Sequence, residues 1–142
     1  MKFILNYEVI NNTEGLQKSF FVRSIVFCEE QNIPYSDEFD EFDCSSVHFL
    51  GTIENEPIAT ARMRLFKDYV KIERLAVRKA YRGKNIGKEM FAFVLNHIAE
   101  MGYKKIQLHA QTYLVKFYED FGFVRKDESF FEVGIEHCFM EK

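Results

Sequence analysis

The segment from Tyr69 to Lys88 combines residue types that can hold a multiply charged anion. A strand-like run, Tyr69 to Val77, is followed by a loop with glycines and bases, and a long amphipathic helical pattern begins after the loop. The first N–H groups of a helix have no partner within it and carry partial positive charge, and glycine lets the backbone approach a phosphate closely. The bases Arg82, Lys84 and Lys88 add favourable charge. We therefore expect either a site for a phosphate-bearing ligand or a loop whose glycines only turn the chain and whose bases are solvated.

Two motifs in and beyond this segment resemble those of a known enzyme family. The loop contains neither G-x-x-x-x-G-K-[ST] nor G-x-G-x-x-G. Instead, ERLAV at 73–77 with YRGKNIGK at 81–88 is similar to the acetyl-coenzyme A site of the GNAT N-acetyltransferases, and FYEDFGF at 117–123 is similar to their C-terminal segment. The spacing and the order of elements agree over almost the whole chain. Three further pieces resemble the bacterial ElaA-like branch of the family: Arg23 to Gln31, Asp43 to His48, and Gly134 to His137 with Met140.

The resemblance implies acetyl-coenzyme A (acetyl-CoA) as cosubstrate. The backbone of residues 82–88 would hold the pyrophosphate, and the pantetheine arm would lie along an open strand edge at 75–77. A backbone N–H near Leu75 would stabilise the oxyanion formed at the thioester. The implied cofactor-binding residues are Leu75, Ala76, Val77, Arg82, Gly83, Lys84, Asn85, Ile86, Gly87 and Lys88.

Asn85 is a departure from the family pattern Q/R-x-x-G-x-G/A, which here reads Arg82-x-x-Asn85-x-Gly87. Asparagine tolerates the left-handed backbone region better than most residues, so the loop can keep its shape. Its side chain would nevertheless crowd a phosphate contact. We expect cofactor binding that is retained but weakened.

Three residues are candidates for moving protons during acetyl transfer. Tyr118 matches the family tyrosine that protonates the departing thiolate, the alternative being a core or surface tyrosine in an aromatic helix. Glu73 is a candidate base, acting directly or through water, and strand alternation predicts that it shares a face with Leu75 and Val77; a salt-bridged glutamate is the alternative. His109, on the polar face of the strand at 106–110, is a second candidate base or a structural histidine. His48 and His137 are candidates for the acceptor pocket, with packing roles as the alternative.

Composition limits the classes of function. The chain has 142 residues, which indicates one domain over 1–142, and 19 bases against 22 acids give a net charge of −3, which argues against nucleic acid or an anionic membrane as the main partner. Three scattered cysteines, no zinc or EF-hand spacing and no signal-peptide pattern predict a cytoplasmic protein without a metal. The acidic run at 29–43 either draws a cationic amine or is a solvated loop.

The hydrophobic pattern predicts an α/β (α+β) fold. We expect strands at 2–10, 47–53, 58–65, 69–77, 105–110 and 136–140. One helix is expected to open at Asn11 or Thr13, a second to run from the basic loop at 78–85 to Gly102, and a third to lie around 113–121. Asn11 and Glu14 have the spacing of a capping box, the segment at 29–46 is expected to be irregular, and 123–133 is ambiguous. The family resemblance implies a mixed, mostly antiparallel sheet flanked by helices and split between its two central strands.

The sequence thus supports an N-acetyltransferase acting on a primary amine of a small molecule or peptide. The alternative is an acyl-CoA-binding or sensor module with weak or no transfer, which Asn85 keeps open. Nucleic-acid binding by the bases at 78–88 is a weaker third hypothesis, opposed by the acidic total. The expected partners are the amine acceptor and, as an alternative to a monomer, a second copy of the chain in a homodimer.

Overall fold

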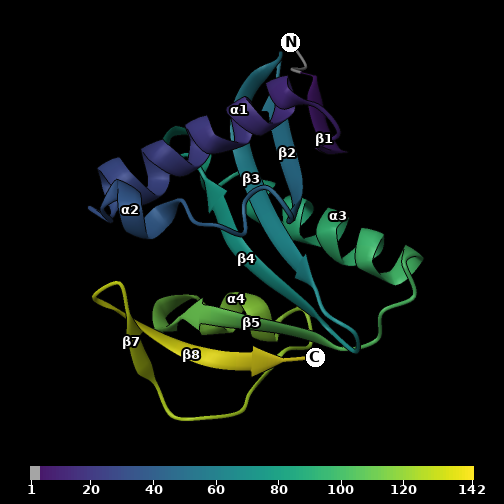
Figure 1. Cartoon of the computed structure of the whole chain (residues 1–142), viewed down its shortest axis with the longest axis vertical. Coiled ribbons are helices and arrows are strands. Elements are labelled where there is room, and N and C mark those ends of the chain that lie inside the picture. The colour runs from purple at the N-terminus through teal and green to yellow at the C-terminus, as the bar shows by residue number, and fades with distance from the viewer. Residues whose placement is uncertain (1–3) are drawn as a thin grey trace.

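The computed structural model describes residues 4–142, which form one sheet with helices on both faces (Figure 1). The strands are β1 (Leu5–Val9), β2 (Val47–Ile53), β3 (Glu56–Leu65), β4 (Val70–Val77), β5 (Ile106–Gln111), β6 (Val124–Arg125), β7 (Phe130–Glu132) and β8 (Ile135–Glu141). The helices are α1 (Thr13–Arg23), which continues as a π-helix over Ser24–Glu30, α2 (Tyr35–Glu38), α3 (Ile86–Glu100) and α4 (Val115–Glu119). The part of the first expected strand at residues 2 and 3 lies outside the described residues.

The strand order is β1-β2-β3-β4-β5-β8-β6, and β7 pairs with β8. Every pair is antiparallel except β4–β5, which confirms the expected mixed, mostly antiparallel sheet. The parallel pairing runs only from Val70↔Ile106 to Ile72↔Leu108. Beyond it, β4 continues with β3 while β5 continues with β8, and Figure 1 shows the two strands separating. This is the expected split between the central strands.

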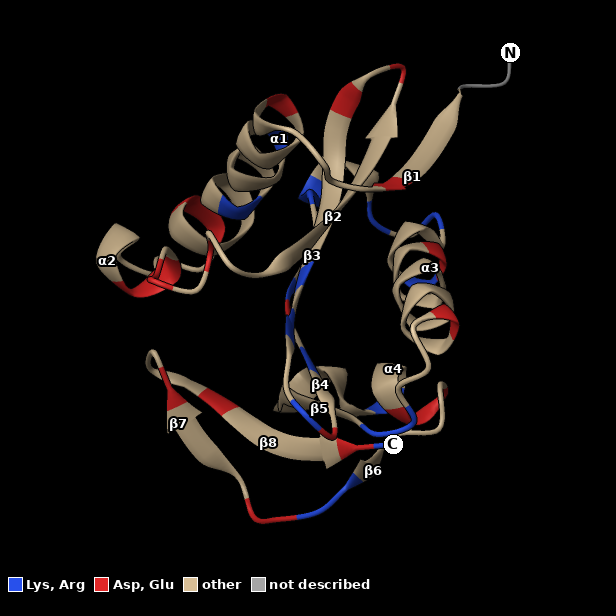
Figure 2. Cartoon of the chain, turned by 45° about the vertical axis from the view of Figure 1, so that its right-hand side comes forward, with Lys and Arg blue, Asp and Glu red and all other residues tan. Residues whose placement is uncertain are grey.

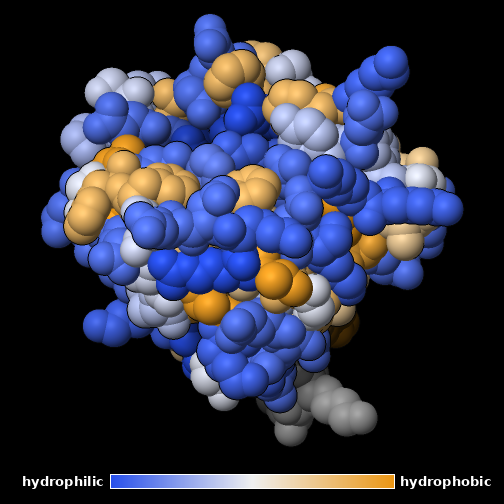
Figure 3. Space-filling view, turned by 90° about the horizontal axis from the view of Figure 1, so that it is seen from below, coloured by the Kyte–Doolittle hydropathy of each residue, from blue (hydrophilic) through white to orange (hydrophobic). Residues whose placement is uncertain are grey.

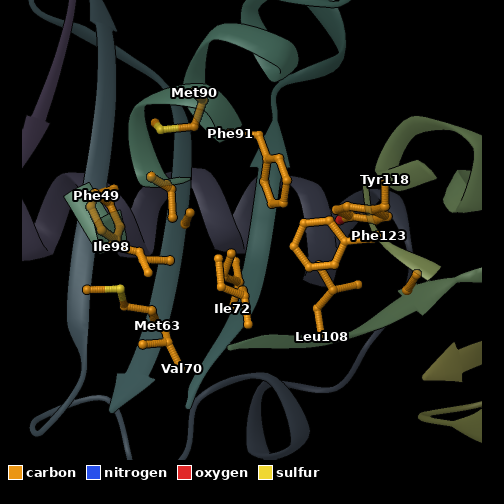
Figure 4. Close-up of a cluster of buried hydrophobic side chains, with 14 of the residues drawn as sticks. Phe49, Met63, Val70, Ile72, Met90, Phe91, Ile98, Leu108, Tyr118 and Phe123 are labelled. Carbon is orange, nitrogen blue, oxygen red and sulfur yellow. The ribbon is translucent and has the colours of Figure 1, made fainter. Parts of the chain in front are cut away.

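The main core lies between the sheet and the α3–α4 face. It includes Phe49, Met63, Ile72, Phe91 and Leu108, all of which are buried (Figure 4). A smaller cluster on the other face joins α1 and the π-helix to Ala76 of β4. The aromatic residues Phe49, Phe91, Tyr118 and Phe123 are buried in the main core, whereas the face seen in Figure 3 is mainly hydrophilic, with hydrophobic residues in small separate groups.

The first helix begins one residue later than the capping-box spacing indicates. Asn12 is the N-cap, and its side-chain oxygen accepts a hydrogen bond of 2.7 Å from the N–H of Gly15. The expected cap at Asn11 is therefore wrong, whereas the alternative start at Thr13 is where the helix begins. The π-helix follows directly on α1, and the two together bury Val22, Val26 and Phe27 while Phe21 stays exposed.

A β-bulge interrupts β4 at Arg74. The residue has a φ of 60°, and the register with β3 changes between Thr60↔Ala76 and Arg62↔Glu73. One extra residue reverses the alternation of side chains. Leu75 packs against the main core whereas Ala76 belongs to the smaller cluster on the opposite face. The expectation that Glu73 shares a face with Leu75 and Val77 is therefore wrong, because strict alternation fails at the bulge.

The ambiguous segment at 123–133 contains β6 and β7, and both pair with β8. Val133 and Gly134 form the two-residue turn between β7 and β8, with φ of 47° and 76°. Positive φ at both positions is the type I′ hairpin geometry. Within residues 4–142, the structure has no helix that is long and apolar enough to cross a bilayer.

Candidate active site

The basic loop, residues 78–85, places the start of α3 beside the unpaired edge of β4. Asn85 precedes the helix with a φ of 64°, so it adopts the left-handed conformation that the sequence predicted it could keep. In the first hydrogen bond of the helix, the N–H of Glu89 donates to the carbonyl of Asn85 at 3.0 Å. The N–H groups of Ile86, Gly87 and Lys88 therefore have no partner within the helix, which makes the turn suited to an anion.

A cavity of about 510 Å³, here called the loop cavity, lies between this turn and the split in the sheet. Nine of the ten sequence-predicted cofactor residues line it: Leu75, Ala76, Val77, Arg82, Gly83, Asn85, Ile86, Gly87 and Lys88. Lys84 is not part of the lining, and its ammonium group lies 6.0 Å from the ring centre of Tyr81. Because β4 pairs with β5 only as far as Ile72, the edge at 75–77 has no neighbouring strand on the side of the split.

Arg82 is held at the mouth of the loop cavity by two contacts. Its Nε donates to the carbonyl of Val77 at 2.8 Å, and its other two nitrogens bind both oxygens of Glu30 at 2.6 and 2.7 Å. These bonds lower the pKa of the Glu30 carboxyl. A carboxylate therefore occupies the guanidinium face that a phosphate would use.

A second cavity of about 350 Å³, here called the acidic cavity, opens on the other side of the split. Its acidic lining consists of Asp37, Glu38, Asp40, Glu73 and Glu132. The two cavities share five lining residues: Phe27, Leu75, Gln111, Leu114 and Tyr118. Ligands in the two cavities would therefore meet at the bulged end of β4 and at α4.

Tyr118 forms part of both cavity walls. Its ring packs against Phe91, with centroids 5.2 Å apart, and against Phe123 (Figure 4). Among the described residues its hydroxyl has no hydrogen-bond partner, and burial raises the pKa of that hydroxyl well above its usual range. A tyrosine in this setting stays protonated and can donate a proton to an anion that forms beside it.

Glu73 lies in the acidic cavity within a cluster of bases. Its carboxylate contacts Arg64 at 2.6 Å, Arg62 at 3.2 Å and Lys71 at 3.6 Å. Burial opposes ionisation, but Arg62, Lys71 and Arg64 together lower the pKa of Glu73. The salt-bridged alternative for this residue thus describes its observed contacts, and a carboxylate with a lowered pKa is a weak proton acceptor.

His109 also lines the acidic cavity, immediately beyond the last β4–β5 pair. Its Nδ1 lies 3.1 Å from a carboxylate oxygen of Glu132 on β7. His137 of β8 lines the same cavity, and its Nε2 is 3.8 Å from the other oxygen of Glu132. Sequence reasoning missed Glu132 because only the β7–β8 hairpin brings it to His109, and no motif surrounds it.

Part of the acidic run at 29–43 is buried, which overturns its interpretation as a solvated, irregular loop. Glu38, within the short α2, and Asp43 are both buried and bind Arg23, whose side chain is fully buried. Asp43 also binds Arg62 at 2.8 Å. Figure 2 shows the acids around α2 and the bases along β3 and β4.

The two buried arginines were not predicted as site residues. Arg62 lies between apolar residues of β3. A positive charge in such a strand, in a chain that also has an acidic run at 29–43, was the available signal that the two would pair. His48 is buried as well, but it is not part of the acidic cavity's lining; its Nε2 lies 2.8 Å from the carbonyl of Asp43, and burial lowers the pKa of its ring. Within the described part of the chain, no group of three or more His, Cys, Asp or Glu side chains is arranged to hold a metal ion.

Comparison with known proteins places these features in a family. Residues 29–142 match the model of the acetyltransferase (GNAT) domain. BSU40680 of Bacillus subtilis, provisionally named an acetyltransferase, is 37% identical over 141 residues, covering 97% of this chain and 96% of that protein. ElaA of Escherichia coli is 33% identical over 129 residues, covering 85% of this chain and 82% of that protein.

Solved structures agree with the sequence matches. The crystal structure of Escherichia coli ElaA superimposes with a TM-score of 0.87 at 30% identity, covering 98% of this chain and 99% of that chain. Arabidopsis thaliana Naa50, solved with the bisubstrate analogue CoA-Ac-MVNAL, has the same fold with a TM-score of 0.76 at 21% identity, covering 97% of each chain. The chain belongs to the GNAT acetyltransferase family, and ElaA is among its homologues.

Proposed function

We propose that this protein is an N-acetyltransferase that transfers the acetyl group of acetyl-CoA directly to a primary amine of a small molecule or peptide. The observation that carries the proposal is the meeting of two cavities at Leu75 and Tyr118. One cavity ends at the unpaired N–H groups of α3, and in the lining of the other five carboxylates outnumber the three bases Arg64, Lys71 and Arg74. An anionic cosubstrate and a cationic amine would thus approach the same point from opposite sides.

The loop cavity has the features that acetyl-CoA needs. The start of α3 offers N–H donors to the pyrophosphate, and Lys88 and Arg82 add positive charge. The free edge of β4 at 75–77 offers main-chain groups to the amide-bearing pantetheine arm, much as a strand would pair. Naa50, which has this fold, was solved in complex with a bisubstrate analogue that contains CoA, and this supports the same use of the fold here.

The proposed reaction forms a C–N bond and breaks a C–S bond. The acceptor ammonium first loses one proton to a base, and the amine lone pair then attacks the thioester carbon. A backbone N–H near Leu75 would stabilise the oxyanion. When the C–S bond breaks, its electron pair leaves on sulfur, which takes a proton from the Tyr118 hydroxyl. The surplus proton of the new amide nitrogen restores that hydroxyl, so one proton reaches solvent per amide formed.

A module that binds acyl-CoA without transferring the acyl group is the second candidate. Two features favour this candidate: Asn85 at the start of α3, and the ion pair between Glu30 and Arg82. Both occupy positions that the phosphate groups of acetyl-CoA would use. Saturable acetyl-CoA binding without thiol release from any amine is the behaviour that it predicts.

Substitution of Tyr118 by Phe tests the proposed chemistry. Acetyl-CoA binding is measured by thermal shift, and transfer is measured as free thiol released with cadaverine, benzylamine and alanyl-alanine. We expect Tyr118→Phe to lower kcat by about 100-fold, the lower end of the usual contribution of general acid catalysis, with acetyl-CoA binding unchanged. Folding is expected to be unaffected, because the hydroxyl has no partner to lose among the described residues.

Tyr69→Phe is the matched control. Tyr69 stacks on Phe66, with centroids 4.6 Å apart, and it lines neither cavity. This variant should keep the activity of the unmodified protein. Unchanged turnover in Tyr118→Phe would remove Tyr118 as the acid.

A further inference from the structure

The β7–β8 hairpin brings a carboxylate and two imidazoles to one wall of the acidic cavity. Residues opposite each other in paired strands lie on the same face, and the register pairs His109 with Phe139 and His137 with Phe130. Glu132, two residues beyond Phe130, therefore shares this face. The Phe130 ring contacts both imidazoles, edge-on to His109 with centroids 5.0 Å apart and stacked with His137 at 6.1 Å.

The contacts of the two histidines determine where their protons lie. The hydrogen bond from His109 lowers the pKa of the Glu132 carboxyl, so Glu132 is an ionised group that can only accept. The Nδ1 of His109 must then carry the proton, and in the neutral ring Nε2 keeps its lone pair. The Nδ1 of His137 lies 2.7 Å from the carbonyl of Ile135, so neutral His137 also lacks a proton on Nε2. Glu132 thus accepts a hydrogen bond from His109 rather than from neutral His137.

We propose that Glu132 is a positioning residue that fixes the Nδ1–H tautomer of His109, and that Nε2 of His109 is the base that takes the proton from the acceptor ammonium. This inference rests on the proposed acetyltransferase function and decides between its two candidate bases. His109 lines the acidic cavity, and its Nε2 has no hydrogen-bond partner among the described residues. Once protonated, the ring is stabilised by the Glu132 carboxylate at 3.1 Å.

Glu73, the competing candidate, is a poorer base in this structure. Three bases surround its carboxylate, and taking a proton would weaken all three ion pairs. His109 loses no contact when it takes a proton, because Nε2 is free among the described residues and Nδ1–H keeps its acceptor. The proton then passes from His109 to solvent, which the 29% exposure of its side chain permits.

Glu132→Leu tests the positioning role, and Glu136→Leu is the matched control. Glu136 is an exposed glutamate on the same hairpin, paired in register with Phe131, and it lines neither cavity. With the three amines named above, we expect Glu132→Leu to lower kcat by 10- to 100-fold at an unchanged KM for acetyl-CoA. His109→Gln should lower kcat by at least as much, and Glu136→Leu should leave it unchanged.

Long-range ¹⁵N spectra of the histidine rings give a readout that a merely structural role would not move. We expect His109 to be the Nδ1–H tautomer at pH 8 in the unmodified protein and in Glu136→Leu, and to shift towards Nε2–H in Glu132→Leu. An Nε2–H ring in the unmodified protein would overturn the inference, as would full activity of Glu132→Leu or His109→Gln.

The same spectra separate failure of the inference from failure of the proposed function. If the unmodified protein transfers acetyl to none of the amines, the proposed function fails in this assay. The tautomer of His109 then still decides whether Glu132 positions it: an Nδ1–H ring that depends on Glu132 supports the contact, and any other result rejects it.

Discussion

Replacement of Asp43 by Asn probes the buried ion-pair cluster beneath the acidic cavity. Asp43 accepts from Arg23 at 2.6 Å and from Arg62 at 2.8 Å, and the side chains of both arginines are at most 1% exposed. Breaking a buried pair by removing one charge costs about 3 to 5 kcal/mol. Because Arg23 keeps Glu38 and Arg62 keeps Asp40 and Glu73, we expect a loss near the lower end, about 3 kcal/mol at pH 7.

The pH dependence of the folding free energy measures the contribution of Asp43 in a second, independent way. Burial would raise the pKa of Asp43, but the hydrogen bonds and charges of Arg23 and Arg62 and the N–H of Asp40 lower it from 3.8 to about 2. The unfolded chain then binds more protons than the folded chain as pH falls, so stability is complete above 3.8 and is lost on acidification through 2. This difference corresponds to about 2 kcal/mol, of which about half is gone at pH 3.

Urea unfolding at pH 7 and pH 3 measures both effects. The gap between the unmodified protein and Asp43→Asn should be about 3 kcal/mol at pH 7 and should narrow by about 1 kcal/mol at pH 3. Glu41→Gln, an exposed acid two residues away, should change stability by less than about 0.5 kcal/mol. A gap below about 1 kcal/mol at pH 7, or one that does not narrow in acid, would refute the reasoning.

Three further substitutions test other parts of the site and fold. Asn85→Gly should tighten acetyl-CoA binding several-fold in a calorimetric titration, because glycine keeps the left-handed turn and removes the side chain from the phosphate position; unchanged affinity would show that Asn85 does not crowd the phosphate. Glu30→Gln should also lower the Kd for acetyl-CoA by freeing Arg82, with stability altered by less than about 1 kcal/mol because the pair is partly exposed; weaker binding would contradict competition between carboxylate and phosphate. Val133→Asn should raise the midpoint of urea unfolding, with a gain of about 1 kcal/mol, because a β-branched residue is strained at a φ of 47° and Asn-Gly suits this turn; a loss of stability would show that the Val133 side chain contributes more by packing.

The predictions from sequence succeeded where the determinants are local. The loop and the start of α3 lie within one short segment, so glycine, Asn85 and the helical period specify their conformation without help from the rest of the chain. The mixed, mostly antiparallel sheet and its split came from the family resemblance and are confirmed. The positions of the candidate acid and of the β4 edge follow from these elements.

The errors arose where a local rule met an irregular backbone. The bulge at Arg74 reversed the face of β4 that follows Glu73. A bulge leaves no mark on a hydrophobic pattern that assumes a period of 2. Arg74 lines the acidic cavity, so the bulge helps to shape its wall.

The sequence by itself thus determined the left-handed turn before α3, the family and the position of Tyr118, because each depends on residues close together in the chain. Only the tertiary structure decided which charged side chains pair with one another. Arg62 contacts Asp40, 22 residues away in the chain; Arg74 contacts Glu38, 36 residues away; and His109 contacts Glu132, 23 residues away. Such pairs depend on strand register and on burial, which makes an unpaired charge costly and so fixes its partner. No pattern along the chain encodes that selection.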